Sequence, residues 1–214
     1  MIKFGTGGWR AIIADGFTKE NIRLLTAGLC KLMEREGLSG STVCLGYDRR
    51  FLSKESMYWA AEVLAGYGYR PYIINRSSPT PLIMFTVKQM GLPYGMAITA
   101  SHNPKEYNGY KAYWEDGAQL SPENSRVVAD AIAKVDVLGG ASRMPIDEAR
   151  ACGLVTMLDK AFDETYLDAV MATAIAPEAV QEVAEELKIV YTPLHGAGYR
   201  LVPEILRRMG MKHL

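Results

Sequence analysis

Short apolar segments alternate along this chain with longer segments of helical periodicity. The apolar segments at residues 42–47, 72–74 and 95–99 have the length and composition of buried strands. The helical segments lie between them, and we expect Thr18 and Ser53 to cap two of these helices, since both residue types are favoured at helix N-termini. Strands that alternate with helices of this length predict an α/β domain on a mostly parallel sheet.

The alternation continues into the second half of the chain. The further elements that we expect are helices at 81–90, 122–135, 159–172 and 177–187, a strand at 188–191, a turn at 192–198 and a helix at 199–209. The strand at 188–191 begins a new strand-helix unit. We therefore expect one complete domain at residues 1–187 and the truncated beginning of a second α/β domain at 188–214.

Polar residues follow directly after two of the expected strands. Residues 48–50 are Asp-Arg-Arg, and residues 101–103 are Ser-His-Asn. In open α/β sheets, sites form outside the carboxyl ends of the strands. Both tripeptides are therefore candidate site residues, although the first also fits a solvated strand end with a local ion pair.

The segment from Thr99 to Lys111 combines a hydroxyl nucleophile, an imidazole, amide side chains and a lysine, and we expect these to lie in one loop. An isolated Ser-His pair is more often a turn that satisfies backbone groups. The Gly-x-Ser-x-Gly turn of serine hydrolases is absent, which disfavours that class. A lone lysine such as Lys111 is more often a solvated surface residue.

Three motifs together point to one family. The string from Thr99 to Lys111 resembles the phosphoserine loop of the α-D-phosphohexomutases, the phosphoglucomutase/phosphomannomutase superfamily. Residues 5–10, Gly-Thr-Gly-Gly-Trp-Arg, are similar to that family's N-terminal glycine-rich signature, and residues 46–50 are similar to its Gly-x-Asp-x-Arg element. The implied fold is a three-layer α/β/α domain with a mixed, mostly parallel sheet.

The resemblance also implies roles for individual residues. Ser101 would carry the phosphoryl group, Arg10 and Lys111 would stabilise charge, and His102 or Lys111 would move protons. Expected phosphate- or substrate-binding residues are Thr6, Gly7, Arg50, Asn103 and Asn108. His195 lies in a turn that is similar to one in the family's second domain, and we expect a structural role for it.

The implied reaction is reversible phosphoryl transfer between C1 and C6 of a hexose phosphate, through a phosphoserine and a 1,6-bisphosphate. The family uses Mg²⁺, which would meet Ser101 through its phosphate, and glucose 1,6-bisphosphate as activator. The family's aspartate loop for the metal does not occur in this sequence, and the resemblance covers about the first two-fifths of a family member. We therefore expect this chain to be inactive without the C-terminal domains of the same protein. Phosphopentomutase, phosphoglucosamine mutase and a non-catalytic phosphate-binding module remain alternatives.

Composition bears on partners and compartment. Lys+Arg and Asp+Glu both number 24, so no global charge favours nucleic acid, and no apolar run is long enough for a membrane span. Cys30, Cys44 and Cys152 are far apart and lie among apolar residues, so we expect buried free thiols in a reducing cytoplasm.

Overall fold

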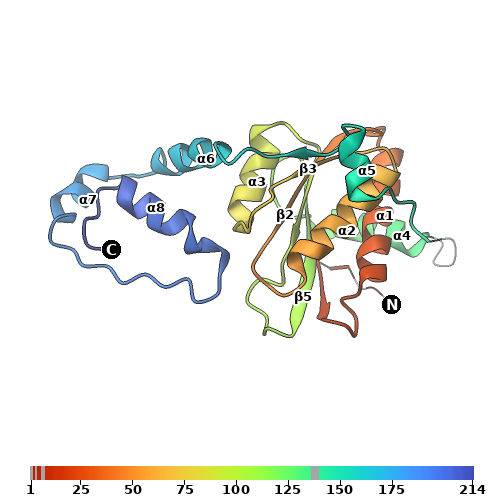
Figure 1. The fold of residues 1–214 in the computed structure, drawn as a ribbon, viewed down its shortest axis with the longest axis horizontal. Coiled ribbons are helices and arrows are strands. Elements are labelled where there is room, and N and C mark those ends of the chain that lie inside the picture. The colour runs from red at the N-terminus through yellow and green to blue at the C-terminus, as the bar shows by residue number, and fades with distance from the viewer. Residues whose placement is uncertain (1, 3, 6–7, 136–139) are drawn as a thin grey trace. The chain divides into compact units, whose positions relative to one another are not determined.

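The chain forms two compact units, Met1–Leu158 and Asp159–Leu214, in the computed structural model. The structure describes residues 2, 4–5, 8–135 and 140–214, apart from the side chain of residue 124 (Figure 1).

The first unit is built on a six-stranded mixed sheet with the order β1-β5-β4-β2-β3-β6. Its strands are β1 Trp9–Ile12, β2 Thr42–Tyr47, β3 Arg70–Ile73, β4 Tyr94–Ile98, β5 Tyr107–Tyr113 and β6 Thr156–Met157. β2 pairs in parallel with β3 and β4, β3 pairs in parallel with β6, and β5 is antiparallel to both β1 and β4. The mixed, mostly parallel α/β sheet expected from the sequence is confirmed.

Helices cover the sheet on both faces, which gives three layers (Figure 1). The helices are α1 Lys19–Arg35, α2 Ser53–Gly66, α3 Thr80–Gln89, α4 Pro122–Ala133 and α5 Ile146–Ala151. α1 packs against α2 and α4, while α3 packs against β2 and β4. The apolar stripe of α1, including Ile22, Leu25 and Leu29, is buried in the main core. Burial of such a stripe is what stabilises a helix that would be marginal alone.

The two expected helix caps differ in outcome. The Thr18 hydroxyl accepts a hydrogen bond from the Asn21 amide, so Thr18 caps α1 as predicted. The cap of α2 is Leu52, in the left-handed region at φ 62°, and the prediction for Ser53 is wrong. The Ser53 hydroxyl instead donates to Asp48 at 2.7 Å, because this carboxylate lies within reach and competes with the helix terminus.

The segment expected as one loop between Thr99 and Lys111 is in fact a loop followed by a strand. Asn108, Gly109 and Lys111 belong to β5, paired to β1 and β4. Gly109 lies opposite Arg10, and a Cβ there would approach the carbonyl oxygens of both Thr99 and Trp9 to 2.6 Å. Glycine is thus what lets these three backbone segments meet.

The second unit is helical. It contains α6 Phe162–Met171, α7 Pro177–Val183, a short 3-10 helix η1 Ala197–Tyr199 and α8 Leu201–Arg208. The strand expected at 188–191 is wrong: within residues 159–214, all of which are described, Lys188 forms a single bridge to His213. A strand needs a neighbour to pair its backbone groups, and none is present in this segment.

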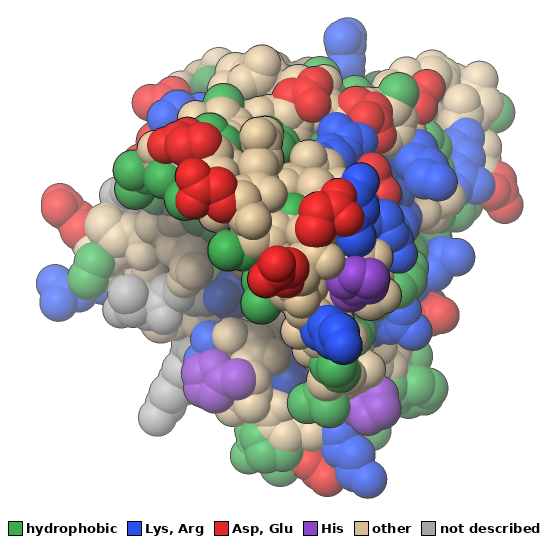
Figure 2. Space-filling view, turned by 90° about the vertical axis from the view of Figure 1, so that its left-hand side faces the viewer, with side chains coloured by type: hydrophobic (Ala, Val, Ile, Leu, Met, Phe, Trp, Pro, Cys, Tyr) green, Lys and Arg blue, Asp and Glu red, His purple; other side chains and the backbone are tan. Residues whose placement is uncertain are grey.

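The second unit is held together by contacts between its own helices. α6 packs against α8, and buried Asp163 of α6 forms an ion pair with Arg200. The Arg208 guanidinium contacts Glu204 on its own helix and carboxylates on α6. The helix expected at 159–172 therefore packs with the helix expected at 199–209. Acidic and basic side chains both occur across the face of the molecule in Figure 2.

The predicted burial of the cysteines is confirmed for two of the three. Cys30 and Cys44 are buried free thiols, and burial raises the pKa of both. Cys152 is free but exposed at the end of the short helix α5, so the expected burial is wrong there. None of the described helices is both long and apolar enough to cross a bilayer.

Replacement of Gly109 tests the close approach of the strands. We expect Gly109→Ala to lower the free energy of unfolding by about 1–3 kcal/mol, because the added methyl meets backbone oxygens that cannot turn away. Gly5→Ala is the matched control, since no atom of the described residues lies within 4 Å of its Cβ position. Urea unfolding of both variants measures the difference, and equal midpoints would contradict the close contact.

Candidate functional site

The candidate site lies where β2 and β4 end side by side. The two strands pair in parallel up to Tyr47 and Ile98, and the Asp48 amide donates to the Ile98 carbonyl at 3.1 Å. This bond holds the chain after β2 against the chain after β4. The tripeptides at 48–50 and 101–103 are therefore brought together, as the parallel sheet predicts.

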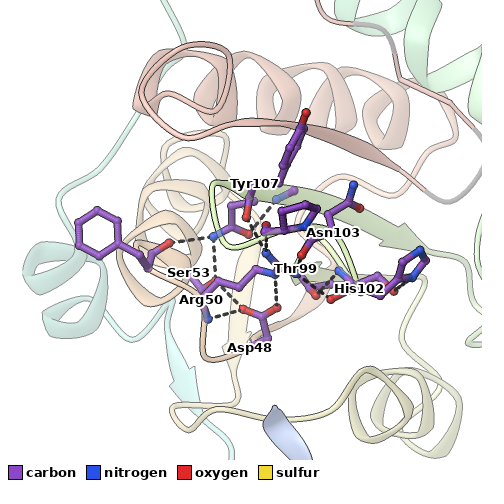
Figure 3. A network of polar contacts seen from close by, with 12 residues as sticks. Asp48, Arg50, Ser53, Thr99, His102, Asn103 and Tyr107 are labelled. Atoms are coloured by element: carbon purple, nitrogen blue, oxygen red, sulfur yellow. Dashed lines mark hydrogen bonds and ion pairs between the residues drawn. The ribbon is translucent and has the colours of Figure 1, made fainter. Parts of the chain in front are cut away.

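Arg50 is at the centre of this junction (Figure 3). Its Nη1 donates to the carbonyls of Pro104 and Tyr107 at 2.8 and 2.9 Å. Its Nη2 donates to the carbonyls of Ser101 and Asn103 at 2.9 and 2.5 Å. Four backbone carbonyls of one loop thus converge on one guanidinium group.

The fifth donor of Arg50 is directed at Asp48, whose Oδ2 lies 3.5 Å from Nε. A guanidinium has five N–H donors, so the whole set faces protein oxygens. In this structure Arg50 therefore binds the loop backbone, and its expected role in binding phosphate or substrate stays a prediction. The sequence analysis left two interpretations of residues 48–50, a site or a local ion pair at a strand end, and the structure contains the ion pair between Asp48 and Arg50.

Asp48 is itself held by a buried chain of hydrogen bonds. Its Oδ1 accepts from the Arg50 amide and from the Ser53 hydroxyl at 2.8 and 2.7 Å. The Asn108 amide group donates to Ser53 Oγ and to the Phe51 carbonyl, and its Oδ1 accepts from the Gly109 amide. Asn108 is fully buried, so it joins α2 to β5 and does not reach a ligand. This differs from the substrate-binding role expected for it.

Ser101 is presented to solvent by an uncommon backbone conformation. Its φ is 57°, in the left-handed region that non-glycine residues seldom occupy. The Ser101 amide donates to Thr99 Oγ1 at 3.0 Å, which closes the turn. Both Ser101 and His102 are exposed, and Ser101 Oγ lies 3.4 Å from His102 Nδ1. A nucleophilic hydroxyl and an imidazole are therefore adjacent, as the sequence predicted.

Asn103 is partly buried in the same loop, and its side-chain oxygen is buried without a hydrogen-bond partner among the described residues. A buried oxygen acceptor does not attract an anion. The side-chain amide nitrogen of Asn103 is the group that suits the expected phosphate contact.

Lys111 and Arg10 form a pair of cations on one face of the sheet. Arg10 lies opposite Gly109, two residues from Lys111 along β5, so the two side chains share that face. Lys111 is only 7% exposed, whereas Arg10 is exposed. Burial, and secondly the charge of Arg10, lower the pKa of Lys111 from its ordinary value. A lysine in such surroundings suits stabilisation of an anion or transfer of a proton.

The remaining expected residues are placed as follows. Thr6 and Gly7 lie outside the described residues. The adjoining Gly8 has φ 112°, and its Cα lies so near the Tyr110 carbonyl that a Cβ would overlap it. Gly8 therefore lies directly against β5 beside Lys111. His195 is exposed in the second unit, in the turn before η1.

The described residues do not fit a complete magnesium site. Mg²⁺ takes several oxygen ligands in near-octahedral geometry. In the part of the chain that the structure describes, no three His, Cys, Asp or Glu side chains are grouped closely enough to hold a metal. The expected contribution of Ser101 is a single ligand, through a phosphate.

The burial of Lys111 predicts a cost in stability. We expect Lys111→Met to raise the free energy of unfolding at neutral pH by about 1–2 kcal/mol, because it removes a desolvated charge. Lys105→Met, in the exposed part of the loop, is the matched control and should change stability by less than about 0.5 kcal/mol.

The pH dependence of this gain has a defined sign. The pKa of Lys111 is lower in the folded chain than in the unfolded chain, so its cost is full below the folded pKa. That cost fades as the pH rises toward the unfolded pKa, near 10.4. Urea unfolding across this range should show the gain shrinking, and a gain that is absent at neutral pH would contradict the desolvation.

Comparisons with known proteins identify relatives of this chain. Residues 1–138 match the family described as phosphoglucomutase/phosphomannomutase, alpha/beta/alpha domain I. A phosphoglucomutase from Staphylococcus haemolyticus is 30% identical over 218 residues, which span 100% of this chain and 38% of that protein. One from Staphylococcus aureus is 32% identical over 213 residues, spanning 97% of this chain and 37% of that protein.

A solved structure supports the same relationship. A protein from Thermus thermophilus described as a phosphomannomutase superposes with a TM-score of 0.83 at 27% identity, covering 99% of this chain and 44% of its own. The chain thus spans less than half the length of these relatives. With the matched domain covering most of its residues, the chain belongs to the phosphoglucomutase/phosphomannomutase family.

Proposed function

We propose that this chain is the phosphoserine-bearing part of a phosphohexomutase, which interconverts the 1- and 6-phosphates of glucose or mannose. The observation that carries the proposal is Ser101, held exposed in a left-handed turn at the end of β4. The turn lies at the carboxyl end of the parallel strands, and β5, which carries Lys111, pairs with the same β4. The phosphoglucomutases and the phosphomannomutase found as relatives support the reaction class.

The reaction is a pair of phosphoryl transfers through Ser101. The bond between phosphorus and Ser101 Oγ breaks as a bond to a sugar hydroxyl oxygen forms, and the sugar becomes a bisphosphate. The proton of the sugar hydroxyl passes to His102 or Lys111, and Ser101 Oγ takes up a proton as it leaves phosphorus. In the return step both protons move in the opposite direction. The bisphosphate reorients and returns its other phosphoryl group to Ser101 Oγ, so the serine is regenerated as phosphoserine.

Charge stabilisation falls to the two cations. The transferring group spreads its negative charge over peripheral oxygens, and preorganised donors stabilise that charge. Arg10 supplies a permanent charge, and Lys111 a charge that burial makes easier to release as a proton. Thr6, Gly7 and Asn103 are proposed to bind the phosphate or the substrate.

The rest of the proposal concerns the whole protein. The chain spans 38% of a curated relative, so we propose that further domains of the same protein complete the active site. In this division, residues 1–187 belong to domain I and residues 188–214 begin domain II. Mg²⁺ is proposed as cofactor, with ligands besides the Ser101 phosphate drawn from outside the described residues, and glucose 1,6-bisphosphate as activator. We propose a cytoplasmic location.

Phosphoryl transfer to Ser101 tests the function. When the gene product that contains these residues meets glucose 1,6-bisphosphate, we expect one added phosphate, mapped to Ser101 by mass spectrometry. Ser101→Ala should abolish this label, because alanine has no oxygen to accept the group. Ser142→Ala, at an exposed serine away from the loop, should leave it unchanged. Phosphate on another residue would remove the basis of the proposal.

Residues 1–214 alone should not turn over. We expect less than about a tenth of the mutase rate of a full-length relative, since an incomplete metal site and a missing sugar site each cost more than about 1.4 kcal/mol of barrier. A coupled assay on highly purified chain measures this rate. A rate within tenfold of the relative would show that the chain is sufficient.

A further inference from the structure

We infer that Arg50 is the positioning residue of the phosphoryl carrier: its guanidinium fixes the Ser101–Tyr107 loop so that Ser101 Oγ faces Lys111 of β5 and Arg10 of β1. The inference rests on the proposed function for Ser101. It assigns to Arg50 a task that is distinct from contact with substrate, since the group acts through the loop backbone.

The loop has few backbone hydrogen bonds of its own. The Asn103 amide donates to the Ala100 carbonyl at 3.1 Å, and the Tyr107 amide donates to the Pro104 carbonyl at 3.1 Å. The four terminal donors of Arg50 bind carbonyls that span the loop from Ser101 to Tyr107. Hydrogen bonds to a charged donor are roughly twice as strong as neutral ones. Arg50 therefore contributes four charged hydrogen bonds to a segment that has few others.

The backbone of Ser101 needs such support. A non-glycine residue in the left-handed region is strained and persists only where its surroundings fix it. Nη2 of Arg50 binds the carbonyl of Ser101 itself and that of Asn103. These two bonds fix the backbone on the C-terminal side of Ser101, and the backbone conformation determines where the Ser101 side chain points.

Arg50 is itself immobilised from the opposite side. Its Nε faces Asp48, and Asp48 is bound by the Ser53 hydroxyl, which in turn accepts from buried Asn108 of β5. The strand that carries Lys111 is thereby linked to the group that holds the Ser101 loop. The carboxylate also balances the charge of Arg50, whose side chain is 15% exposed.

A lysine at this position separates charge from geometry. Arg50→Lys keeps the positive charge but replaces a planar fork by three donors on one nitrogen, which cannot reach four dispersed carbonyls. Because the charge at position 50 is unchanged, any change in the electrostatic surroundings of Ser101 then indicates that the loop has moved. Arg70→Lys, at an exposed arginine that begins β3, is the matched control.

The experiment uses this chain with a phosphoryl group installed on Ser101 through a phosphoserine-specific suppressor tRNA. Phosphorus NMR follows the titration of the phosphate, which faces Arg10, Lys111 and His102 when the loop is held. In the unaltered chain we expect its pKa to lie below the value of about 6 for an exposed phosphoserine. Arg50→Lys should return the pKa toward 6, and Arg70→Lys should not.

Hydrogen exchange on the same variants measures the loop directly. Amides of residues 101–107 should exchange at least about tenfold faster in Arg50→Lys, because charged hydrogen bonds are lost. The amides of β2 and β4 report whether the variant is folded. Faster loop exchange together with the changed phosphate titration supports the inference.

Two results overturn the inference. One is an Arg50→Lys chain that matches the unaltered chain in both measurements. The other applies when the unaltered chain shows the lowered phosphate pKa: faster loop exchange in Arg50→Lys with an unchanged phosphate titration would make Arg50 merely structural. If the unaltered chain already titrates like an exposed phosphoserine, the cation site of the proposed function fails, and the exchange data alone decide whether Arg50 fixes the loop.

Discussion

The parallel pairing of β2 with β4 is the constraint on which the candidate site depends. It places two chain segments, distant in sequence, at one edge of the sheet, and the bond from the Asp48 amide to the Ile98 carbonyl extends the pairing past the strands. β2 leads into helix α2, whereas β4 turns back through a loop into its antiparallel neighbour β5. Here one turn carries the arginine and the other the serine whose loop that arginine binds. Neither segment forms the site without the other.

The cations of the site divide into two kinds because their surroundings differ. Arg50 directs its donors to carbonyls and to Asp48, and it is therefore committed to the protein. Arg10 and Lys111 form no ion pair within the described part of the chain, and Lys111 is largely desolvated. An unbalanced, buried positive charge lowers stability, and such a cost is typical of positions kept for function. Arg10 and Lys111 are therefore left to attract an anion, while a different cation, Arg50, holds the loop.

Much of the fold could be predicted from the sequence, for identifiable physical reasons. The strand at residues 42–47 has the expected bounds because its apolar run is buried on both faces, and Thr18 caps its helix through local chemistry. The two-residue strand β6 carries no such pattern and forms through its pairing with β3. The segment at 188–191 has strand propensity but no neighbouring strand, so tertiary context decided against it. Propensity is a weak guide where a partner is required.

The candidate site, like the fold, could be predicted only in part from the sequence. The position of Ser101 and His102 could be predicted from the sequence, because the two residues are consecutive and follow a strand. Their side chains are in contact, as expected for adjacent residues. The roles of Arg50 and Asn108 could not be predicted, since a motif records residue types without showing which groups already satisfy their donors. Asn108 reads as a ligand-binding amide until its three hydrogen bonds to Phe51, Ser53 and Gly109 are seen. Buried polar groups are paired in folded proteins. In this chain, the donors of Arg50 and Asn108 are paired with groups in and around the loop that presents Ser101.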